Sequence, residues 1–182
     1  RNELGSKYGF CAAVLSNQKT SHVTLVNPKI VCHEQSTANG AYAIFGGAVV
    51  IEGGTIDTCN RQGHGVDASY GGHVYCNGTV IHTGGRNSGA LATDFQGGYI
   101  TVRDIDATTE IPGSPGIYTA GKSIITAYNS KFLSKGCEAV MVAHSLGHTY
   151  LYDCELTGTV LHVSLDGNYI GHIVIADVVK ED

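Results

Sequence analysis

Short runs of alternating apolar and polar residues recur along the chain, and each run ends in a small residue that favours a turn. Seven runs align with one another, for example 22–27, 48–53 and 99–104, at intervals of about 24 to 27 residues. Alternation with a period of two is typical of β-strands, and a fixed repeat of this length is typical of solenoids. The pattern predicts an all-β, right-handed parallel β-helix, a single-stranded solenoid of about seven coils.

The residues that close these runs form a predicted turn ladder. Asn and Asp tolerate left-handed backbone and hydrogen-bond within their own turn, and stacked one coil apart their side chains can also bond one another. The predicted members are Asn27, Gly53, Asn77, Asp104, Asn129, Asp153 and Asp177.

Counting from each turn residue gives three predicted inward columns that would form the core. Two residues before the turn lie Leu25, Ile51, Tyr75, Val102, Ala127, Leu151 and Ile175. Four residues before it lie Val23, Val49, His73, Ile100, Ile125, Thr149 and Ile173. Three residues after it lie Ile30, Ile56, Val80, Ala107, Phe132 and Leu156.

A further strand recurs once in each coil, and its members include 41–45, 65–70, 90–95 and 116–120. No linker separates the repeats, so the sequence predicts a single β-helix domain over 1–182, either complete or a fragment of a longer solenoid. A β-sandwich is the rival architecture, but it would show hairpin turns and no fixed repeat near 25 residues.

Composition supports strands and limits the partners. The chain has 25 glycines, ten tyrosines and no tryptophan, with a formal charge of −5. This charge repels phosphate backbones and argues against nucleic acid, and no apolar run is long enough to span a membrane. Six cysteines lack a close CxxC pair, which argues against a zinc site. Disulfides in an extracellular protein and buried thiols remain open alternatives.

Several segments resemble a known family. Gly65-Val-Asp-Ala-Ser-Tyr-Gly-Gly, Ala90-Leu-Ala-Thr-Asp-Phe-Gln-Gly-Gly and Ser114-Pro-Gly-Ile-Tyr-Thr-Ala-Gly are similar to segments of secreted bacterial and fungal right-handed parallel β-helix proteins, the pectate-lyase-like or adhesin-like branch. The resemblance covers roughly residues 40 to 158 and implies an extracellular or cell-surface location. It implies no particular activity, because the superfamily includes lyases, hydrolases and adhesins.

The residues that could carry catalysis are sparse. Gly63-His64-Gly65 matches a short piece of the polygalacturonase pattern, but no adjacent aspartate pair accompanies it, and His64 reads best as a turn residue. Asp67 and Asp94 are the candidate acids for a polysaccharide lyase or hydrolase. Asp104 and Asp106, with Arg103, could form a calcium site, although the turn ladder explains them as well. No metal or other cofactor is expected.

The recurring second strand carries the candidate ligand-binding residues. Its outward positions align as Asp67, Ala92, Tyr118, Met141 and His162, with Asp94 two residues further along its strand. Carboxylates, a tyrosine and a histidine on one flat face could bind a sugar chain, since tyrosine offers a ring and aspartate accepts hydroxyl hydrogens. The competing interpretation is an ordinary solvent-exposed strand.

A second outward row is uncharged and rich in β-branched residues: Thr24, Val50, Val74, Thr101, Thr126, Tyr150 and Val174. Such a strip is typical of an interface, so self-association is expected. Taken together, the sequence favours a secreted or cell-surface β-helix with a structural, adhesive or glycan-binding role. A polysaccharide-active enzyme of the pectin-lyase-like superfamily is the alternative.

Overall fold

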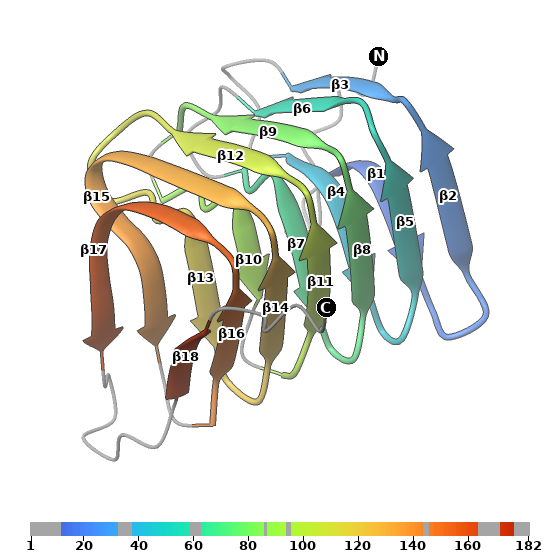
Figure 1. The fold of residues 1–182 in the computed structure, drawn as a ribbon. Helices are drawn as coiled ribbons and strands as arrows, with labels where there is room; N and C mark the ends of the chain where they lie inside the picture. The colour runs from blue at the N-terminus through green and yellow to red at the C-terminus, as the bar shows by residue number, and fades with distance from the viewer. Residues whose placement is uncertain are drawn as a thin grey trace, which may run out of the picture.

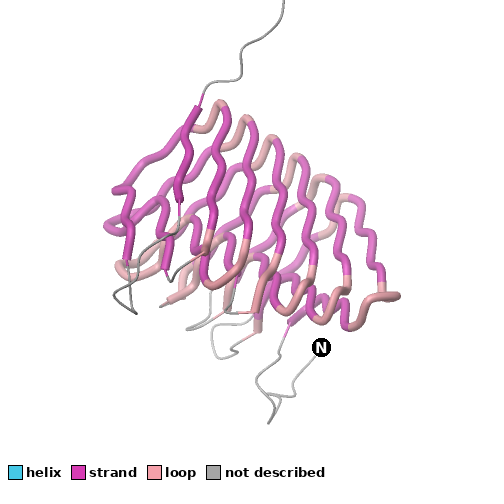
Figure 2. The backbone as a smooth tube through the Cα atoms, turned by 90° about the horizontal axis from the view of Figure 1, so that it is seen from below, coloured by secondary structure: helices cyan, strands magenta, loops and turns pink. Residues whose placement is uncertain are grey.

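The computed structural model describes residues 12–32, 38–58, 63–85, 87–93, 96–143, 146–163 and 172–176. These residues form strands and turns without a helix, and all strand pairs are parallel (Figures 1 and 2). None of the described segments is a helix that could cross a membrane. The predicted all-β parallel solenoid is therefore confirmed.

Two sheets wind around a common core. The seven-stranded sheet contains the runs used to find the repeat: β2 (His22–Val26), β5 (Ala48–Glu52), β8 (His73–Asn77), β11 (Tyr99–Arg103), β14 (Ile124–Tyr128), β16 (His148–Tyr152) and β18 (His172–Ala176). Figure 2 shows the strands of successive coils side by side, with turns at corresponding places.

The eleven-stranded sheet supplies the other two sides of each coil. One side contains β3 (Lys29–Cys32), β6 (Thr55–Thr58), β9 (Val80–Thr83) and β12 (Asp106–Thr109). The other contains β1 (Ala12–Asn17), β4 (Asn39–Ile44), β7 (Val66–Ser69), β10 (Leu91–Thr93) and β13 (Ile117–Ala120). The long strands β15 (Lys131–Ala143) and β17 (Glu155–Val163) run through both sides and join them into one sheet.

The described chain makes about five turns, fewer than the seven expected. Seven stacked strands enclose only six repeats, and the last repeat contains residues outside the described ranges. The difference therefore comes from counting strands in place of completed turns.

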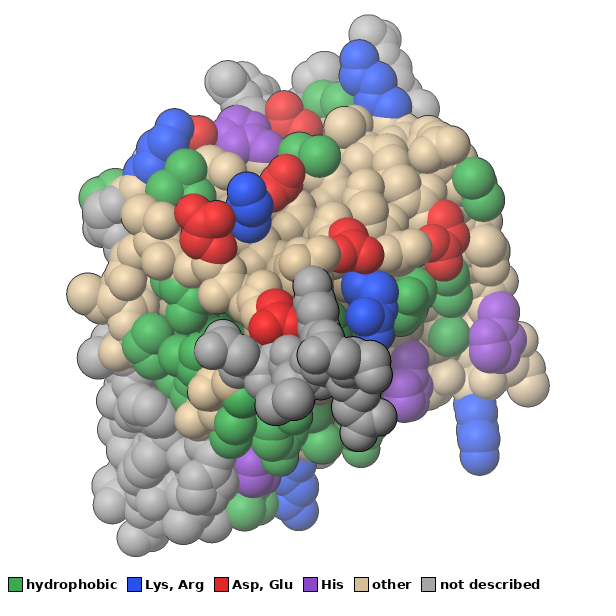
Figure 3. Space-filling model, viewed as in Figure 1, with side chains coloured by type: hydrophobic (Ala, Val, Ile, Leu, Met, Phe, Trp, Pro, Cys, Tyr) green, Lys and Arg blue, Asp and Glu red, His purple; other side chains and the backbone are tan. Residues whose placement is uncertain are grey.

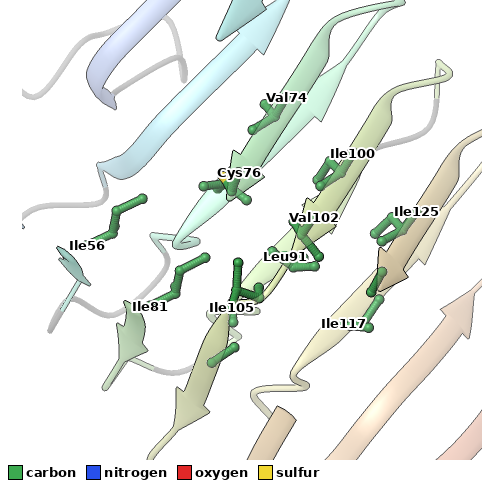
Figure 4. Packing of buried hydrophobic residues seen from close by; sticks show 14 of the residues in the cluster. Ile56, Val74, Cys76, Ile81, Leu91, Ile100, Val102, Ile105, Ile117 and Ile125 are labelled. Atoms are coloured by element: carbon green, nitrogen blue, oxygen red, sulfur yellow. The ribbon is translucent and has the colours of Figure 1, made fainter. Parts of the chain in front are cut away.

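The core consists of columns of apolar side chains, one from each coil. Ile100 stacks between Val74 and Ile125, and Val102 packs beside Cys76 in the next column (Figure 4). These side chains are at most 2 % exposed. No single coil encloses a core, so stacking the coils is what removes this surface from water.

One predicted strand, β8, is displaced by one residue from its expected register. Val49 pairs with Val74 and Ile51 with Cys76, so Val74 and Cys76 point inward. His73 and Tyr75, which were predicted to be core residues, point outward. A shift of one residue turns every side chain of a strand to the opposite face.

The shift arises at the turn that follows β8. Gly78, and not Asn77, takes the left-handed backbone, with a φ of 61° that matches 68° at Gly53 and 53° at Asp104. Glycine adopts positive φ without a steric cost, so it takes this position over the adjacent asparagine. The following strand moves with it, so Ile81 is buried and Val80 is 47 % exposed.

Four other predicted turn residues share the left-handed backbone of the turn. Asn27, Asp104, Asn129 and Asp153 all have φ between 46° and 53°. The Asn129 side-chain amide donates a hydrogen bond to the Asp104 carboxylate one coil away. Asn77 is instead the last residue of β8, and its amide donates to the Glu52 carboxylate over 2.9 Å. Asp177 lies outside the described residues.

The shifted register can be tested with two neighbouring alanine substitutions. We expect Ile81→Ala to lower the free energy of unfolding by about 2–5 kcal/mol, because it leaves a cavity in the core. Val80→Ala should change it by about 0.5 kcal/mol or less, because the side chain is largely exposed. Urea unfolding monitored by circular dichroism measures both. A larger loss of unfolding free energy for Val80→Ala than for Ile81→Ala would contradict the observed register and support the one predicted from the sequence.

Candidate functional sites on the sheet faces

The outward positions of the recurring second strand lie on β7, β10, β13 and β15, and we call this surface the second-strand face. Its predicted column of residues is aligned over four coils, but the column is not fully exposed. Asp67 pairs with Ala92, Ala92 with Tyr118, and Tyr118 with Met141. Tyr118 is half-buried, whereas Asp67 is only 8 % exposed and Ala92 only 2 %. Both interpretations of the sequence required Asp67 to lie on a flat, solvent-exposed strand face. The structure shows instead that Asp67 is buried.

Asp67 belongs to a buried hydrogen-bond network that also contains His64. Its carboxylate accepts hydrogen bonds from the Asn39 amide at 2.9 Å and from the Ser69 hydroxyl at 3.2 Å. The side-chain amide oxygen Oδ1 of Asn39 accepts from the backbone N–H of His64. The His64 ring accepts from the backbone N–H of Gly89 through Nδ1, which places the imidazole proton on Nε2. Asn39 thus links Asp67 and His64, two of the three catalytic candidates, and these hydrogen bonds connect neighbouring coils.

The structure does not bring the other candidates into this group. Asp94 lies outside the described residues. His162 pairs in register with Val142, and Leu161 takes the place opposite Met141. His162 was therefore assigned to the wrong column, because the register of β15 and β17 shifts between Leu133 and Val140.

The proposed calcium group is also divided by the fold. Asp104 lies in the turn, where it accepts from Asn129. Arg103 points outward from the seven-stranded sheet, and Asp106 begins β12 in the other sheet. Within the described parts of the chain, no three His, Cys, Asp or Glu side chains are grouped so that they could hold a metal ion.

The outer face of the seven-stranded sheet carries a concentration of aromatic rings that the sequence analysis missed. Because β8 is shifted, the middle outward row reads Thr24, Val50, Tyr75, Thr101, Thr126, Tyr150 and Val174. The rows on either side of it contain His73, Tyr99, His148, Tyr128 and Tyr152. We call this surface the aromatic face. Glu52 and Arg103 are the charged Asp, Glu, Lys or Arg residues among its described outward positions.

Several rings on the aromatic face stack along the solenoid. The His73 and Tyr99 rings are 4.6 Å apart and 11° from parallel, and the Tyr128 and Tyr152 rings are 5.1 Å apart and 13° from parallel. The Arg103 guanidinium lies over Tyr128, 4.6 Å from the ring centroid. Rings stacked in this way cover one another's faces and turn their edges, with the tyrosine hydroxyls, toward solvent.

Tyr75 and Tyr150 have no aromatic register neighbour, although the Tyr150 ring is stacked with the His148 ring of its own strand, with centroids 6.1 Å apart and planes 6° from parallel. Thr101 lies beside Tyr75, Thr126 lies beside Tyr150, and both tyrosines are half-buried. Three strand intervals separate the two tyrosines, which corresponds to about 14 Å at ~4.8 Å per strand. No aromatic side chain occupies the two register positions between them.

Charged side chains gather instead on the sheet side formed by β6, β9, β12 and β15. Nδ1 of the His82 ring lies 3.4 Å from the Asp57 carboxylate, and Nε2 lies 3.1 Å from the Glu110 carboxylate. Lys135 donates to the same Glu110 carboxylate at 2.9 Å. Figure 3 shows acidic, basic and histidine side chains close together in the upper part of the molecule, where these strands lie. These four side chains, Asp57, His82, Glu110 and Lys135, form a charged ladder over four coils. The charged ladder is exposed to solvent, so it contributes little to stability.

An open hollow of about 350 Å³ lies on the same side of the solenoid. Its lining includes Asp106, Thr108, Lys131, Leu133, Glu155 and Thr157. Lys131 and Glu155 form an ion pair across it at 3.6 Å, and both side chains are about two-thirds exposed. An exposed pair of this kind lacks the desolvation that tunes a catalytic acid or base.

The described cysteines are thiols. Cys32, Cys76 and Cys154 are free, and burial raises the pKa of the Cys76 thiol to about 12. The side chains of Cys11, Cys59 and Cys137 lie outside the description. A fully buried thiol in an inward column acts as a small apolar side chain.

Comparisons with known proteins show no family for this chain. No family model matches it, and no solved structure matches it. A zinc-transporting ATPase of Synechocystis is 33 % identical over 63 residues, which are 35 % of this chain and 8 % of that protein. A cadmium, zinc and cobalt-transporting ATPase of Helicobacter felis is 31 % identical over 62 residues, 34 % of this chain and 9 % of that protein. The chain spans less than a tenth of these relatives, so the matches transfer no activity.

The charged ladder gives a direct prediction for the pKa of Glu110. The Lys135 hydrogen bond is the largest cause that lowers the pKa of Glu110, with His82 adding to it. We expect Lys135→Met to raise the pKa of Glu110 toward its ordinary value, as measured by NMR titration of the side-chain carboxyl carbon. Lys131→Met is the matched control, because Lys131 pairs with Glu155 instead. An unchanged Glu110 pKa in Lys135→Met would show that the pair does not form in solution.

The sign of the pH dependence follows from this lowered pKa. The contribution of Glu110 to stability is fully present above its unfolded-state pKa and is lost as the pH falls through its folded-state value.

Proposed function

We propose that this protein is a secreted or cell-surface β-helix that binds glycans on its aromatic face without cleaving them. The observation that carries the proposal is the collection of tyrosine and histidine rings, flanked by threonines, on the outward face of β8, β11, β14 and β16. The secreted location rests on the family resemblance of the sequence.

The chemistry of this surface suits a carbohydrate. A sugar ring has apolar C–H faces that pack on aromatic rings and hydroxyls that exchange hydrogen bonds. Tyr75 and Tyr150 can supply the ring faces, and Thr101 and Thr126 lie between them. The exposed edges of the stacked tyrosines and histidines add hydrogen-bonding groups on both sides.

An enzyme would need a pair of acids or an acid and a base that converge on a bound sugar. Among the described residues, Asp67 is buried in a network that uses both of its oxygens. Glu52 on the aromatic face accepts from Asn77. Because these carboxylates are already hydrogen-bonded within the protein, binding is favoured over polysaccharide cleavage. Release of cleavage products would favour the enzyme instead.

The proposal predicts which tyrosines matter. We expect Tyr75→Ala and Tyr150→Ala each to weaken binding at least about tenfold, since an aromatic anchor at an interface commonly contributes this much. The measurement is retention of the purified chain on a panel of plant, algal, fungal and bacterial polysaccharides, followed by calorimetry with the glycan that binds. The same reactions are assayed for new reducing ends and unsaturated products.

Tyr118→Ala is the matched control, because Tyr118 is a half-buried tyrosine on the second-strand face. Binding lost in Tyr118→Ala but kept in the other two variants would move the site to the second-strand face and overturn the proposal. Product release that stops in Asp67→Asn, with the fold intact, would establish the enzyme instead. Failure to bind any glycan would leave a structural role.

Self-association is a second candidate, favoured by apolar side chains at the outermost described strands. Val26 on β2 is 69 % exposed and Val31 on β3 is 55 % exposed. Ile175 on β18 occupies an inward column and is 55 % exposed. Surface of this kind commonly marks an interface. Sedimentation analysis over a range of concentrations should give a mass above 19.1 kDa, and a monomer throughout would exclude this candidate.

A further inference from the structure

Tyr128 and Tyr152 form a tyrosine pair with a geometry suited to covalent coupling. They occupy the same register position in β14 and β16, so their side chains leave the sheet in the same direction one coil apart. The ring centroids are 5.1 Å apart and the planes differ by 13°. The two phenol rings therefore lie alongside each other, and the carbons ortho to the hydroxyls, where phenoxyl radicals couple, belong to neighbouring rings.

Neighbouring groups hold this pair in place. Arg103 covers the opposite face of the Tyr128 ring at 4.6 Å, which fixes that ring between a cation and a second phenol. On the other side of Tyr152 the register neighbour is Ala176, a small residue. Both tyrosines are half-buried and point outward, so an oxidant can reach their hydroxyl edges while the backbone keeps the rings adjacent.

We propose that Tyr128 and Tyr152 are an oxidative modification site that forms an intramolecular dityrosine bridge. The oxidant is hydrogen peroxide acting through a haem peroxidase. Each phenol loses one electron and one proton to give a phenoxyl radical. The two radicals join through a carbon–carbon bond between their ortho carbons, and the two ring hydrogens return to the oxygens by tautomerisation. The protein loses two hydrogen atoms in all, and one hydrogen peroxide is reduced to two water molecules.

The bridge would staple two successive coils across the strand pair β14 and β16. A cross-link of one repeat in length restricts the unfolded chain, as a disulfide does, so it should raise the melting temperature by about 5–10 °C. This inference does not depend on glycan binding, because it follows from the ring geometry alone.

The test treats the purified chain with a haem peroxidase and hydrogen peroxide at low protein concentration. We expect dityrosine fluorescence in a product that remains monomeric, a mass loss of two hydrogen atoms, and a cross-linked peptide pair containing Tyr128 and Tyr152. Tyr152→Phe should abolish this product, because it keeps the stacked ring but removes the phenol. Circular dichroism confirms that the variant is folded.

Tyr150→Phe is the matched control, because Tyr150 lies two residues away on the same strand and its register neighbours are Thr126 and Val174. It should form the bridge as the unmodified chain does. Three outcomes would overturn the proposal: no dityrosine, bridges that join other tyrosines or only separate molecules, or an unchanged monomeric product in Tyr152→Phe.

Discussion

Register between successive coils is the constraint on which the rest of this structure depends. Each strand pairs in parallel with the strand one repeat later, so a residue lies beside its counterpart in the next coil, about 4.8 Å away, except where the register of β15 and β17 shifts. Backbone hydrogen bonds hold this alignment at the turns as well as within the strands, for example from Gly78 to Arg103 and from Asn129 to Tyr152. A coil that slipped by one residue would expose its apolar column and bury its polar one.

The same alignment explains why chemical groups occur here as lines. The apolar columns, the Asn–Asp turn ladder, the stacked rings and the Asp57–His82–Glu110–Lys135 ladder each take one member per coil. A solenoid of this kind presents long rows of side chains on flat faces, and such rows suit an extended or repetitive ligand. The aromatic face extends over several coils and presents such a row of rings.

Close backbone approach adds a second requirement to the repeat. A side chain at Gly72 or Gly98 would overlap the carbonyl oxygen of Ala43 or Ala68 in the preceding coil. Ser123 stands at the corresponding place one coil later, and its hydroxyl accepts a hydrogen bond from the backbone N–H of Gly98. Glycine is thus needed at positions 72 and 98, where the chain enters the seven-stranded sheet, whereas the next coil accommodates a serine there.

The sequence predicts most of this fold because its signals repeat, and it fails where a signal is local and ambiguous. Asn77 and Gly78 both tolerate left-handed backbone, and both fit the repeat of 24 to 27 residues, so the run of Asn and Asp turn residues favoured Asn77 although glycine adopts positive φ more readily. That choice turned β8 over and hid Tyr75 and the His73–Tyr99 stack from the sequence analysis. Strand alternation correctly placed Asp67 in its column but could not reveal that this face is buried, because alternation describes direction and not what packs against a strand. Tyr118 shares that column and is half-buried.

The central claim is that the aromatic face binds the ligand, and NMR mapping of the tyrosine rings tests it most directly. The chain would be labelled at its tyrosine rings and titrated with an oligosaccharide selected from the glycan panel. The account predicts that the ring signals of Tyr75 and Tyr150 shift first and most strongly, followed by Tyr99. The signals of Tyr118 and of Tyr42, which pairs with Asp67 in the same column, should stay unchanged. Shifts concentrated at Tyr42 and Tyr118 would contradict it and would place the binding surface on the second-strand face.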